Sequence, residues 1–230
     1  MARIVIEGGD GAGKKTQADL LCRQLECADR MVTMFDFPRY ETSRIGQLIG
    51  EMLSGKHGDF RNASPYLAAL PYTLDRVSVR EDIRRASARG NVAVFNRYTP
   101  SNLAYQGAKL ADPIARAQLI ECIETIEYEE LGIPKPTLVI YLAVSVDVSS
   151  ELVKNKDARA YLGGKEKDQH EADLDFQYAV ANVYRELART RKDWRIVECV
   201  RDGRMRKQED VHGEVWRLVR QHIDTHDIMI

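Results

Sequence analysis

Residues 7–17, EGGDGAGKKTQ, have the types and spacing of a loop that binds phosphate groups. The motif G-x-x-x-x-G-K-[ST] is matched by Gly8, Gly13 and Lys14. Glycines allow backbone angles in which successive N–H groups converge on phosphate oxygens, and the lysine lies along the β- and γ-phosphates. We therefore predict a nucleoside triphosphate site. The residues expected to contact the nucleotide are Gly8, Gly11, Ala12, Gly13, Lys14, Lys15 and Thr16.

The last position of the motif departs from the pattern. It carries Lys15 where the motif has a magnesium-binding serine or threonine, and a hydroxyl follows one residue later at Thr16. Two interpretations stay open. Either the Lys15 ammonium replaces part of the charge of the metal, or Lys15 points away from the phosphates and Thr16 acts instead.

The sequence around the loop predicts a strand before it and a helix after it. Residues 3–7 are apolar and β-branched, and residues 16–25 carry leucines at helical spacing. The N-terminus of such a helix adds partial positive charge to the loop. The alternative interpretation is a glycine-rich turn that merely joins a strand to a helix.

Composition excludes several classes of protein. The 230 residues include 34 lysines and arginines against 35 aspartates and glutamates, a net charge of -1 that gives no reason to expect nucleic acid or an anionic membrane as partner. The four cysteines lack metal-ligand spacing, so we expect reduced core thiols. No secretory segment or membrane-length apolar run appears. We expect a cytoplasmic protein with a single domain that spans residues 1–230.

The order of the elements predicts the fold class. Apolar, β-rich runs alternate with helical patterns, which favours an α/β fold with a five-stranded parallel sheet and helices on both faces. The expected strands are residues 3–7, 31–35, 91–95, 137–142 and 195–199. Helices are expected at residues 43–54, 65–88, 113–131, 173–191 and 209–222. In the second of these, Leu67, Leu70, Leu74 and Val77 predict a buried stripe.

Residues 153–171 form a charged segment with several basic side chains and Gly163-Gly164. We expect a short lid, since a basic flap can close over phosphates and exclude water. The alternative is a solvated loop. We also expect a solvated loop in the short basic run 201–207 after the last strand.

Polar clusters follow two of the predicted strands, where parallel sheets bind their ligands. Arg39 follows the second strand and could hold an acceptor phosphate, and Arg97 stands at the exit of the third. Thr99-Pro100 predicts an N-cap and a first helical residue. Further along, Asn102, Tyr105 and Gln106 share one helical face that suits a base and a sugar. Tyr72 and Arg76, four apart, could stack on a nucleobase and donate to its carbonyl oxygen.

Together these motifs resemble one family, the thymidylate kinases, which are P-loop nucleoside-monophosphate kinases. The resemblance rests on EGGDGAGK (7–14), FPRY (37–40), PYTLDR (71–76) and NRYTPSNLAYQGAK (96–109), and covers nearly the whole chain. It implies a transferase that moves a phosphoryl group from ATP to thymidine monophosphate (dTMP) for nucleotide biosynthesis. It also implies Mg²⁺ as cofactor and a homodimer.

The resemblance implies a role for each matching residue. Lys14, Arg97, Asp10 and a lid cation would be catalytic. Gly11 leaves the loop without the basic residue that some members have, so that cation is expected to be Arg159, with Lys165 as second choice. The substrate contacts are expected at Asp10, Phe37, Arg39, Tyr72, Arg76, Arg97, Ser101, Asn102, Tyr105 and Gln106. Among these, Asp10 would lie near the sugar 3'-hydroxyl and Tyr105 would crowd a 2'-hydroxyl.

Two departures from the family pattern concern the metal. Lys15 replaces the usual hydroxyl, and Asn96 replaces the aspartate that usually opens the strand-three motif. Metal ligands are therefore expected among Asp10, Thr16 and Glu171, and Glu7 is a further possibility. The departures also keep two alternatives open: a nucleotide-binding protein whose kinase activity is impaired or lost, and a kinase for another pyrimidine such as dUMP.

Overall fold

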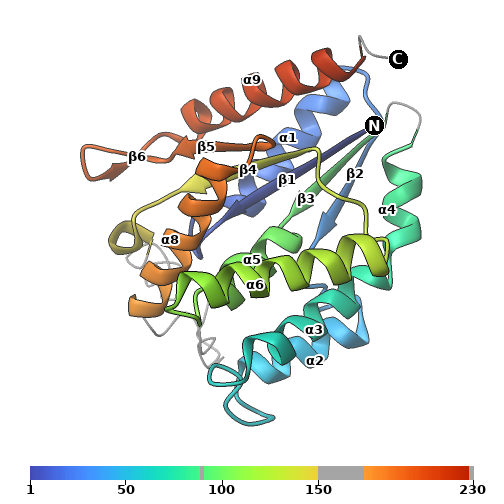
Figure 1. Cartoon of the computed structure of the whole chain (residues 1–230). Coiled ribbons are helices and arrows are strands. Elements are labelled where there is room, and N and C mark those ends of the chain that lie inside the picture. Colours follow the sequence, from blue (N-terminus) through green and yellow to red (C-terminus); the bar gives the residue numbers. More distant parts are fainter. Residues whose placement is uncertain (89–90, 150–173, 228–230) are drawn as a thin grey trace.

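The computed structural model describes residues 1–88, 91–149 and 174–227. Five parallel strands form a central sheet in the order β2-β3-β1-β4-β5 (Figure 1). The predicted α/β class and parallel sheet are thus confirmed, with each strand starting or ending within two residues of its expected position. The strands are β1 (Ala2–Gly8), β2 (Val32–Asp36), β3 (Val92–Asn96), β4 (Leu138–Ala143) and β5 (Trp194–Glu198).

Each face of the sheet carries its own apolar core, because successive side chains of a strand point to opposite faces. On β1, Ile4 and Ile6 pack in one core with α1 (Lys14–Cys27) and α9 (Gln208–Asp227). Val5, between them, packs in the other core. All three side chains are fully buried, so the strand is covered on both sides.

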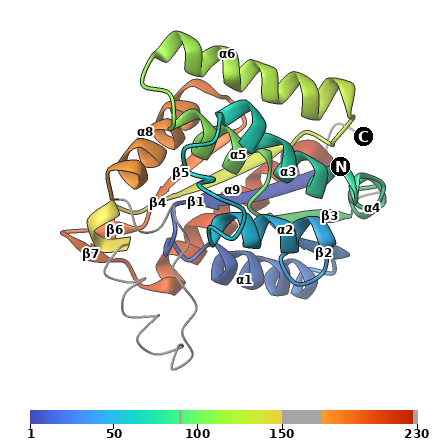
Figure 2. The ribbon, with the colours of Figure 1, turned by 90° about the horizontal axis from the view of Figure 1, so that it is seen from below.

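The second face is covered by a larger group of helices, and Figure 2 shows α6 outside α5 on this side. The helices of this face are α3 (Pro65–Val77), α4 (Arg80–Ala86), α5 (Thr99–Gly107), α6 (Pro113–Glu124), the π-helical turn η1 (Thr125–Glu130) and α8 (Leu174–Thr190). Helix α2 (Arg44–Leu53) packs on α3 through a small separate cluster of apolar side chains.

Three local expectations were wrong. The helix expected at 65–88 is divided into α3 and α4. Thr99 is the first residue of α5 and Tyr98 is its N-cap; the Thr99 hydroxyl donates to Glu127, 2.6 Å away, and does not cap the helix. The run 201–207 contains a small antiparallel hairpin of β6 (Val200–Arg201) and β7 (Arg204–Met205), not just a solvated loop.

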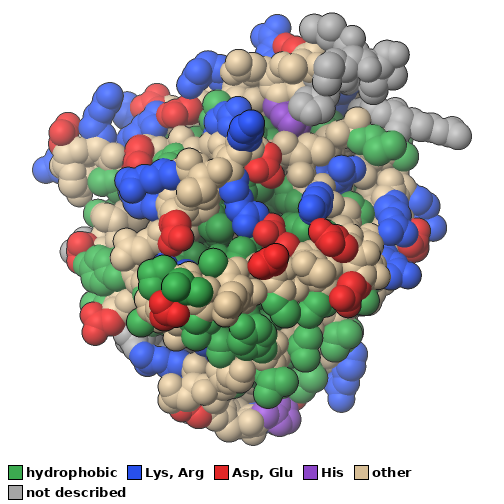
Figure 3. Space-filling view, in the orientation of Figure 1, with side chains coloured by type: hydrophobic (Ala, Val, Ile, Leu, Met, Phe, Trp, Pro, Cys, Tyr) green, Lys and Arg blue, Asp and Glu red, His purple; other side chains and the backbone are tan. Residues whose placement is uncertain are grey.

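The stripe of leucines on α3 is exposed, contrary to the expectation that it is buried. Leu67, Leu70 and Leu74 are 66%, 42% and 51% exposed. Val77, the fourth residue of the predicted stripe, is half-buried and packs against the core. The buried face of α3 instead carries Ala68, Ala69, Thr73, Asp75 and Arg76. Figure 3 shows hydrophobic side chains gathered over α3 and α6. Helical spacing identified an apolar face of α3 correctly, but that face lies on the surface of the chain and not in its core.

Among the described residues, no helix is both long and apolar enough to span a membrane. The four cysteines are unbridged, but only Cys199 is buried and Cys27 is exposed. The expectation of four core thiols was therefore wrong for Cys27.

Candidate functional site

The phosphate-binding loop joins the carboxyl end of β1 to α1. Gly13 adopts a left-handed conformation with φ 80° at the N-terminus of α1. Gly8 lies so close to β4 that a Cβ atom there would be 2.9 Å from the carbonyl oxygen of Leu142. Both positions therefore require glycine. The Lys14 ammonium lies back over the loop and donates to the carbonyl oxygen of Gly9 at 2.6 Å.

Lys15 is turned outward along α1. Its ammonium lies 2.7 Å from Asp19, one helical turn later, and 57% of its side chain is exposed. Thr16 is also exposed. Of the two interpretations of the altered motif, this arrangement favours the one in which Lys15 points away from the phosphates.

Asp10, Arg97 and Tyr105 form a polar cluster beside the loop. The Arg97 guanidinium pairs with Asp10 and lies 5.3 Å from the centre of the Tyr105 ring. The Tyr105 hydroxyl donates to Asp10 at 3.0 Å. Burial alone would raise the pKa of Asp10, but Arg97 and Lys14 hold it below the usual range. Asp10 is therefore a carboxylate at neutral pH, and both cations stay near the loop.

Arg97 itself has a left-handed backbone, with φ 61° directly after β3. A non-glycine residue in this conformation is uncommon and often marks a functional position. Here it follows a strand in the centre of the sheet and allows the guanidinium to reach Asp10.

Glu7, the last residue but one of β1, is fully buried beside this cluster and was not expected to be a positioning residue. Its carboxylate accepts hydrogen bonds from Ser101 Oγ at 2.7 Å, Tyr184 OH at 2.8 Å and Tyr98 N at 2.8 Å. The backbone N–H of Ser101 donates to it as well, at 3.1 Å. Burial raises the pKa of Glu7, although these donors and Arg97 counteract it. With so many donors around it, Glu7 fixes the start of α5 and has little capacity left for a metal ion.

Arg39 is held in place by Asp75, which sequence reasoning also missed. The Asp75 carboxylate accepts from the backbone N–H of Arg39 at 2.9 Å and from its Nε at 3.1 Å. Asp75 is 1% exposed and also accepts from Ser43 Oγ at 2.7 Å. Phe37 anchors the same loop, since it is buried and packs on Tyr98. The loop therefore presents Arg39 in a fixed position.

A second buried carboxylate, Glu127, organises the residues expected to read a base. It accepts from Arg76 Nε at 2.8 Å, from Arg76 Nη2, and from Asn102 Nδ2 at 3.0 Å. Thr73 and Thr99 donate to it at 2.8 and 2.6 Å. Glu127 is fully buried and Arg76 is 2% exposed. Burial would raise the pKa of Glu127, but Arg76 more than offsets this and the pKa lies below its usual range.

Two amide oxygens beside this network lack partners. Asn102 Oδ1 and Gln106 Oε1 are buried and have no hydrogen bond to any described residue. A buried amide oxygen without a partner costs about 1–3 kcal/mol, so such atoms call for a ligand or water. Tyr72 is half-buried nearby on α3 and packs against Phe60.

The structure brings together most of the expected site residues at the carboxyl end of the sheet, but not all of them are described. Arg159, Lys165, Glu171 and the whole expected lid, residues 153–171, lie outside the described residues.

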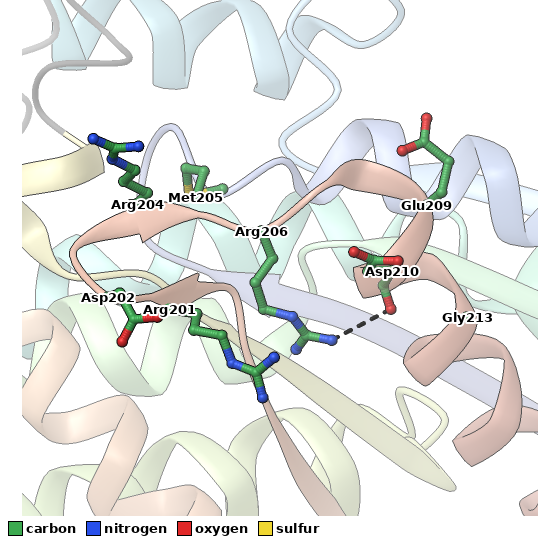
Figure 4. A pocket seen from close by; sticks show the side chains of 8 residues that line it. All are labelled: Arg201, Asp202, Arg204, Met205, Arg206, Glu209, Asp210 and Gly213. Atoms are coloured by element: carbon green, nitrogen blue, oxygen red, sulfur yellow. Dashed lines mark hydrogen bonds between the residues drawn. The ribbon is translucent and has the colours of Figure 1, made fainter.

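A hollow of about 950 Å³ opens between the β6–β7 hairpin and the start of α9 (Figure 4). Arg206 crosses it and donates to the carbonyl oxygen of Asp210 at 3.4 Å. The start of α9, which forms one wall of the hollow, is bonded to α1: Gln17 donates to the carbonyl oxygen of Gln208 at 3.2 Å. The lining residues are Arg201, Asp202, Arg204, Met205, Arg206, Glu209, Asp210 and Gly213.

Comparisons with known proteins agree with this geometry. The family model described as thymidylate kinase matches residues 6–210. A thymidylate kinase of Mycobacterium tuberculosis is 35% identical over 185 residues, which cover 80% of this chain and 85% of the relative. One from Synechococcus is 29% identical over 221 residues, 96% of each chain. The solved structure of Candida albicans thymidylate kinase superposes with a TM-score of 0.72 at 25% identity, and covers 96% of this chain and 91% of the other. The chain belongs to the thymidylate kinase family, a family of P-loop nucleoside-monophosphate kinases.

Proposed function

We propose that this protein transfers the γ-phosphoryl group of ATP to dTMP and releases ADP and thymidine diphosphate (dTDP). Family membership supports this reaction over a nucleotide-binding role without transfer. The choice of dTMP as the acceptor rests on the buried pair of Arg76 and Asn102. Glu127 holds both side chains, and the amide oxygen of Asn102 has no hydrogen-bond partner among the described residues.

This pair suits a thymine ring. Asn102 Nδ2 is committed to Glu127, so its Oδ1 is left to accept a hydrogen bond from the ring N3–H. Arg76 uses Nε and Nη2 on Glu127, so Nη1 is the nitrogen with which it can donate to the ring carbonyl at C4. Cytosine has an acceptor at N3 and an amino group at C4, which would leave both protein groups unmatched. Such mismatches against buried polar groups are strongly rejected.

The charged cluster suits the phosphate groups. Arg39 and Arg97 would bind the acceptor phosphate, while Lys14 would lie along the phosphates of ATP. An oxygen of the dTMP phosphate attacks the γ-phosphorus, a new P–O bond forms, and the bond to the bridging oxygen of ADP breaks. Little covalent catalysis is needed, so positioning and charge neutralisation provide most of the rate.

The contact of Tyr105 with Asp10 supports a preference for deoxyribose. The hydroxyl of Tyr105 donates to Asp10 at 3.0 Å, and Phe176 packs against the same ring, 6.2 Å between centroids. The ring is therefore held on two sides, and we propose that it closes the space that a 2'-hydroxyl would occupy.

Magnesium fits the donors present at this end of the sheet. Mg²⁺ prefers oxygen ligands and keeps several waters when it binds nucleotide phosphates. The unpartnered oxygen of Asn96 is of the required kind, and Asp10 stays a predicted ligand whose two oxygens accept from Arg97 and Tyr105 here. When bound, the ion would neutralise charge on the phosphates. Thr16 and Glu171 stay predicted ligands.

The remaining expectations extend this proposal. We propose one kinase domain over residues 1–230, with residues 153–171 as a lid that contributes Arg159 as the catalytic cation. The hollow would take the base of ATP, because the start of α9 that forms one of its walls is hydrogen-bonded to the helix that follows the phosphate loop. We propose that the enzyme works in the cytoplasm.

We further propose a homodimer through the exposed apolar surface of α3 and α6. Leu67, Leu70 and Leu74 of α3 lie on it, and Ile114 of α6 is 69% exposed. Contiguous exposed apolar surface of this kind is typical of a protein–protein interface.

The test is release of ADP from ATP and Mg²⁺ with each of dTMP, dUMP, dCMP and the ribonucleotide of thymine. We expect dTMP to be the best acceptor and dCMP to be inactive. A protein that turns over dCMP as well as dTMP would contradict the proposed base recognition. Absence of turnover with dTMP at every Mg²⁺ concentration would favour the alternative of a nucleotide-binding protein without transfer.

A further inference from the structure

Asn96, which replaces the usual aspartate of the family pattern, has a carboxylate beside it on the neighbouring strand. Asp36 is its register partner across β2 and β3, and both residues end their strands. Asn96 Nδ2 donates to Asp36 Oδ1 at 2.7 Å. One carboxylate and one amide are thus present at this edge of the sheet.

Strand alternation places this pair on the side of α1. Val94 of β3 and Met34 of β2 pack in the core formed with α1 and α9. Asn96 and Asp36 each lie two residues further along, so they share that face. Asn96 is also the register partner of Ile6 on β1, the strand that leads into the phosphate loop. The pair therefore lies on the face of the phosphate-loop helix, while the base-reading network lies on the opposite face.

The pair has oxygen atoms to spare. Asn96 is 9% exposed, and its Oδ1 has no hydrogen-bond partner among the described residues. The hydrogen bond from Asn96 uses only Oδ1 of Asp36. A purely structural pair would leave the buried Asn96 oxygen unsatisfied, at a cost of about 1–3 kcal/mol. Water or a cation with its water shell would satisfy it.

Charge around Asp36 also leaves room for a cation. Lys15, at the start of α1, is bound to Asp19 rather than to Asp36. No ion pair joins Asp36 to a cation within the described residues.

We propose that Asp36 supplies the carboxylate that is missing at position 96, so that Asp36 on β2 and Asn96 on β3 together orient the hydrated Mg²⁺ of the bound nucleotide. This inference rests on the proposed function only in that a nucleotide binds the phosphate loop. Asp36 is a positioning residue that acts through the water shell of the ion. A carboxylate on the neighbouring strand explains how the chain accommodates asparagine at a position where a carboxylate is expected.

The test compares Mn²⁺ binding to the protein–ADP complex, measured by electron paramagnetic resonance, in the parent and three variants. Asp36→Asn removes the carboxylate, and we expect the dissociation constant of Mn²⁺ to rise about 10–100-fold, as for other residues that orient metal ligands. The swap Asp36→Asn with Asn96→Asp restores one carboxylate and one amide, and we expect it to recover most of the lost affinity. Asp19→Asn is the matched control, since it removes a carboxylate near Lys15 but leaves the pair intact.

Affinity for ADP without metal shows whether each variant is folded and binds nucleotide, and we expect it to change less than twofold. Unchanged Mn²⁺ affinity in Asp36→Asn would overturn the proposal. So would a swap variant as weak as Asp36→Asn. Neither result depends on phosphoryl transfer, so failure of the proposed dTMP kinase activity would be seen separately.

Discussion

Replacing Glu127 with glutamine tests the network that orients the base-reading residues. Glu127 is fully buried and accepts hydrogen bonds from Thr73, Thr99, Asn102 and twice from Arg76. Glutamine has nearly the same shape but no charge, so it leaves the buried Arg76 guanidinium without a counter-ion. Breaking a buried ion pair in this way costs about 3–5 kcal/mol. For a chain of this size that corresponds to a fall in Tm of roughly 6–20 °C.

The same substitution should weaken recognition of dTMP, because Arg76 and Asn102 both lose the group that positions them. We expect KM for dTMP to rise at least about tenfold, the change that corresponds to ~1.4 kcal/mol, with KM for ATP nearly unchanged. Calorimetry and steady-state kinetics measure the two effects. Glu124→Gln is the matched control, since Glu124 pairs with Arg191 at a site where both side chains are 26% exposed. Its expected cost is at most about 1 kcal/mol.

The loss of stability at acid pH provides an independent check of the Glu127 network. The folded-state pKa of Glu127 is lowered, because Arg76 outweighs the effect of burial. Its stabilising contribution is therefore complete above the unfolded pKa of about 4.3 and is lost as pH falls below it. Between roughly pH 5 and pH 3 the parent should lose more stability than Glu127→Gln. If Glu127→Gln is as stable as Glu124→Gln, binds dTMP normally and loses stability in acid as the parent does, then Glu127 does not hold Arg76 and Asn102 in place.

Three further changes probe other parts of the site. Asp75→Asn removes the carboxylate that fixes Arg39, so kcat/KM for dTMP should fall about tenfold or more while KM for ATP is preserved. Equal losses of kcat/KM for dTMP and for ATP would contradict this role of Asp75. Tyr105→Phe removes the hydroxyl bound to Asp10, and the ratio of activity on dTMP to that on the ribonucleotide should fall; an unchanged ratio argues against Tyr105 as the sugar gate. Leu70→Glu places a charge in the exposed stripe of α3, and sedimentation should show a shift from dimer to monomer, whereas a parent that is already monomeric excludes the proposed interface.

The sequence predicted the sheet and the phosphate loop because their signals are local. A β-branched run, three loop residues at fixed spacing and a helical pattern lie within one short segment, residues 3–25. The same is true of Arg39 and Arg97, which directly follow predicted strands. Such residues are found at the carboxyl edge of the sheet wherever the strands are parallel.

The residues that hold the site together were not predicted, because their partners are distant in sequence. Glu127 meets Arg76 from 51 residues away, and Asp75 meets Arg39 from 36 residues away. One signal for Glu127 was available: it lies four residues after Ile123 and so falls on the buried face of its helix. A carboxylate on a buried face requires a buried donor, and Arg76 is that donor.

The leucines of α3 show a different limit. Their spacing predicted an apolar face, but spacing alone does not tell whether the chain itself or a second copy covers it. The buried face of α3 is made of small and polar residues that serve the site, and this left the leucines outside.

Transfer to dTMP can be observed by following the phosphoryl group itself. ATP carrying oxygen-18 in its γ-phosphate is incubated with the enzyme, Mg²⁺ and dTMP, and the products are analysed by mass spectrometry. We expect dTDP that carries the label, formed in equal amount to ADP. Labelled inorganic phosphate without labelled dTDP, or no ADP at any Mg²⁺ concentration, would contradict the account.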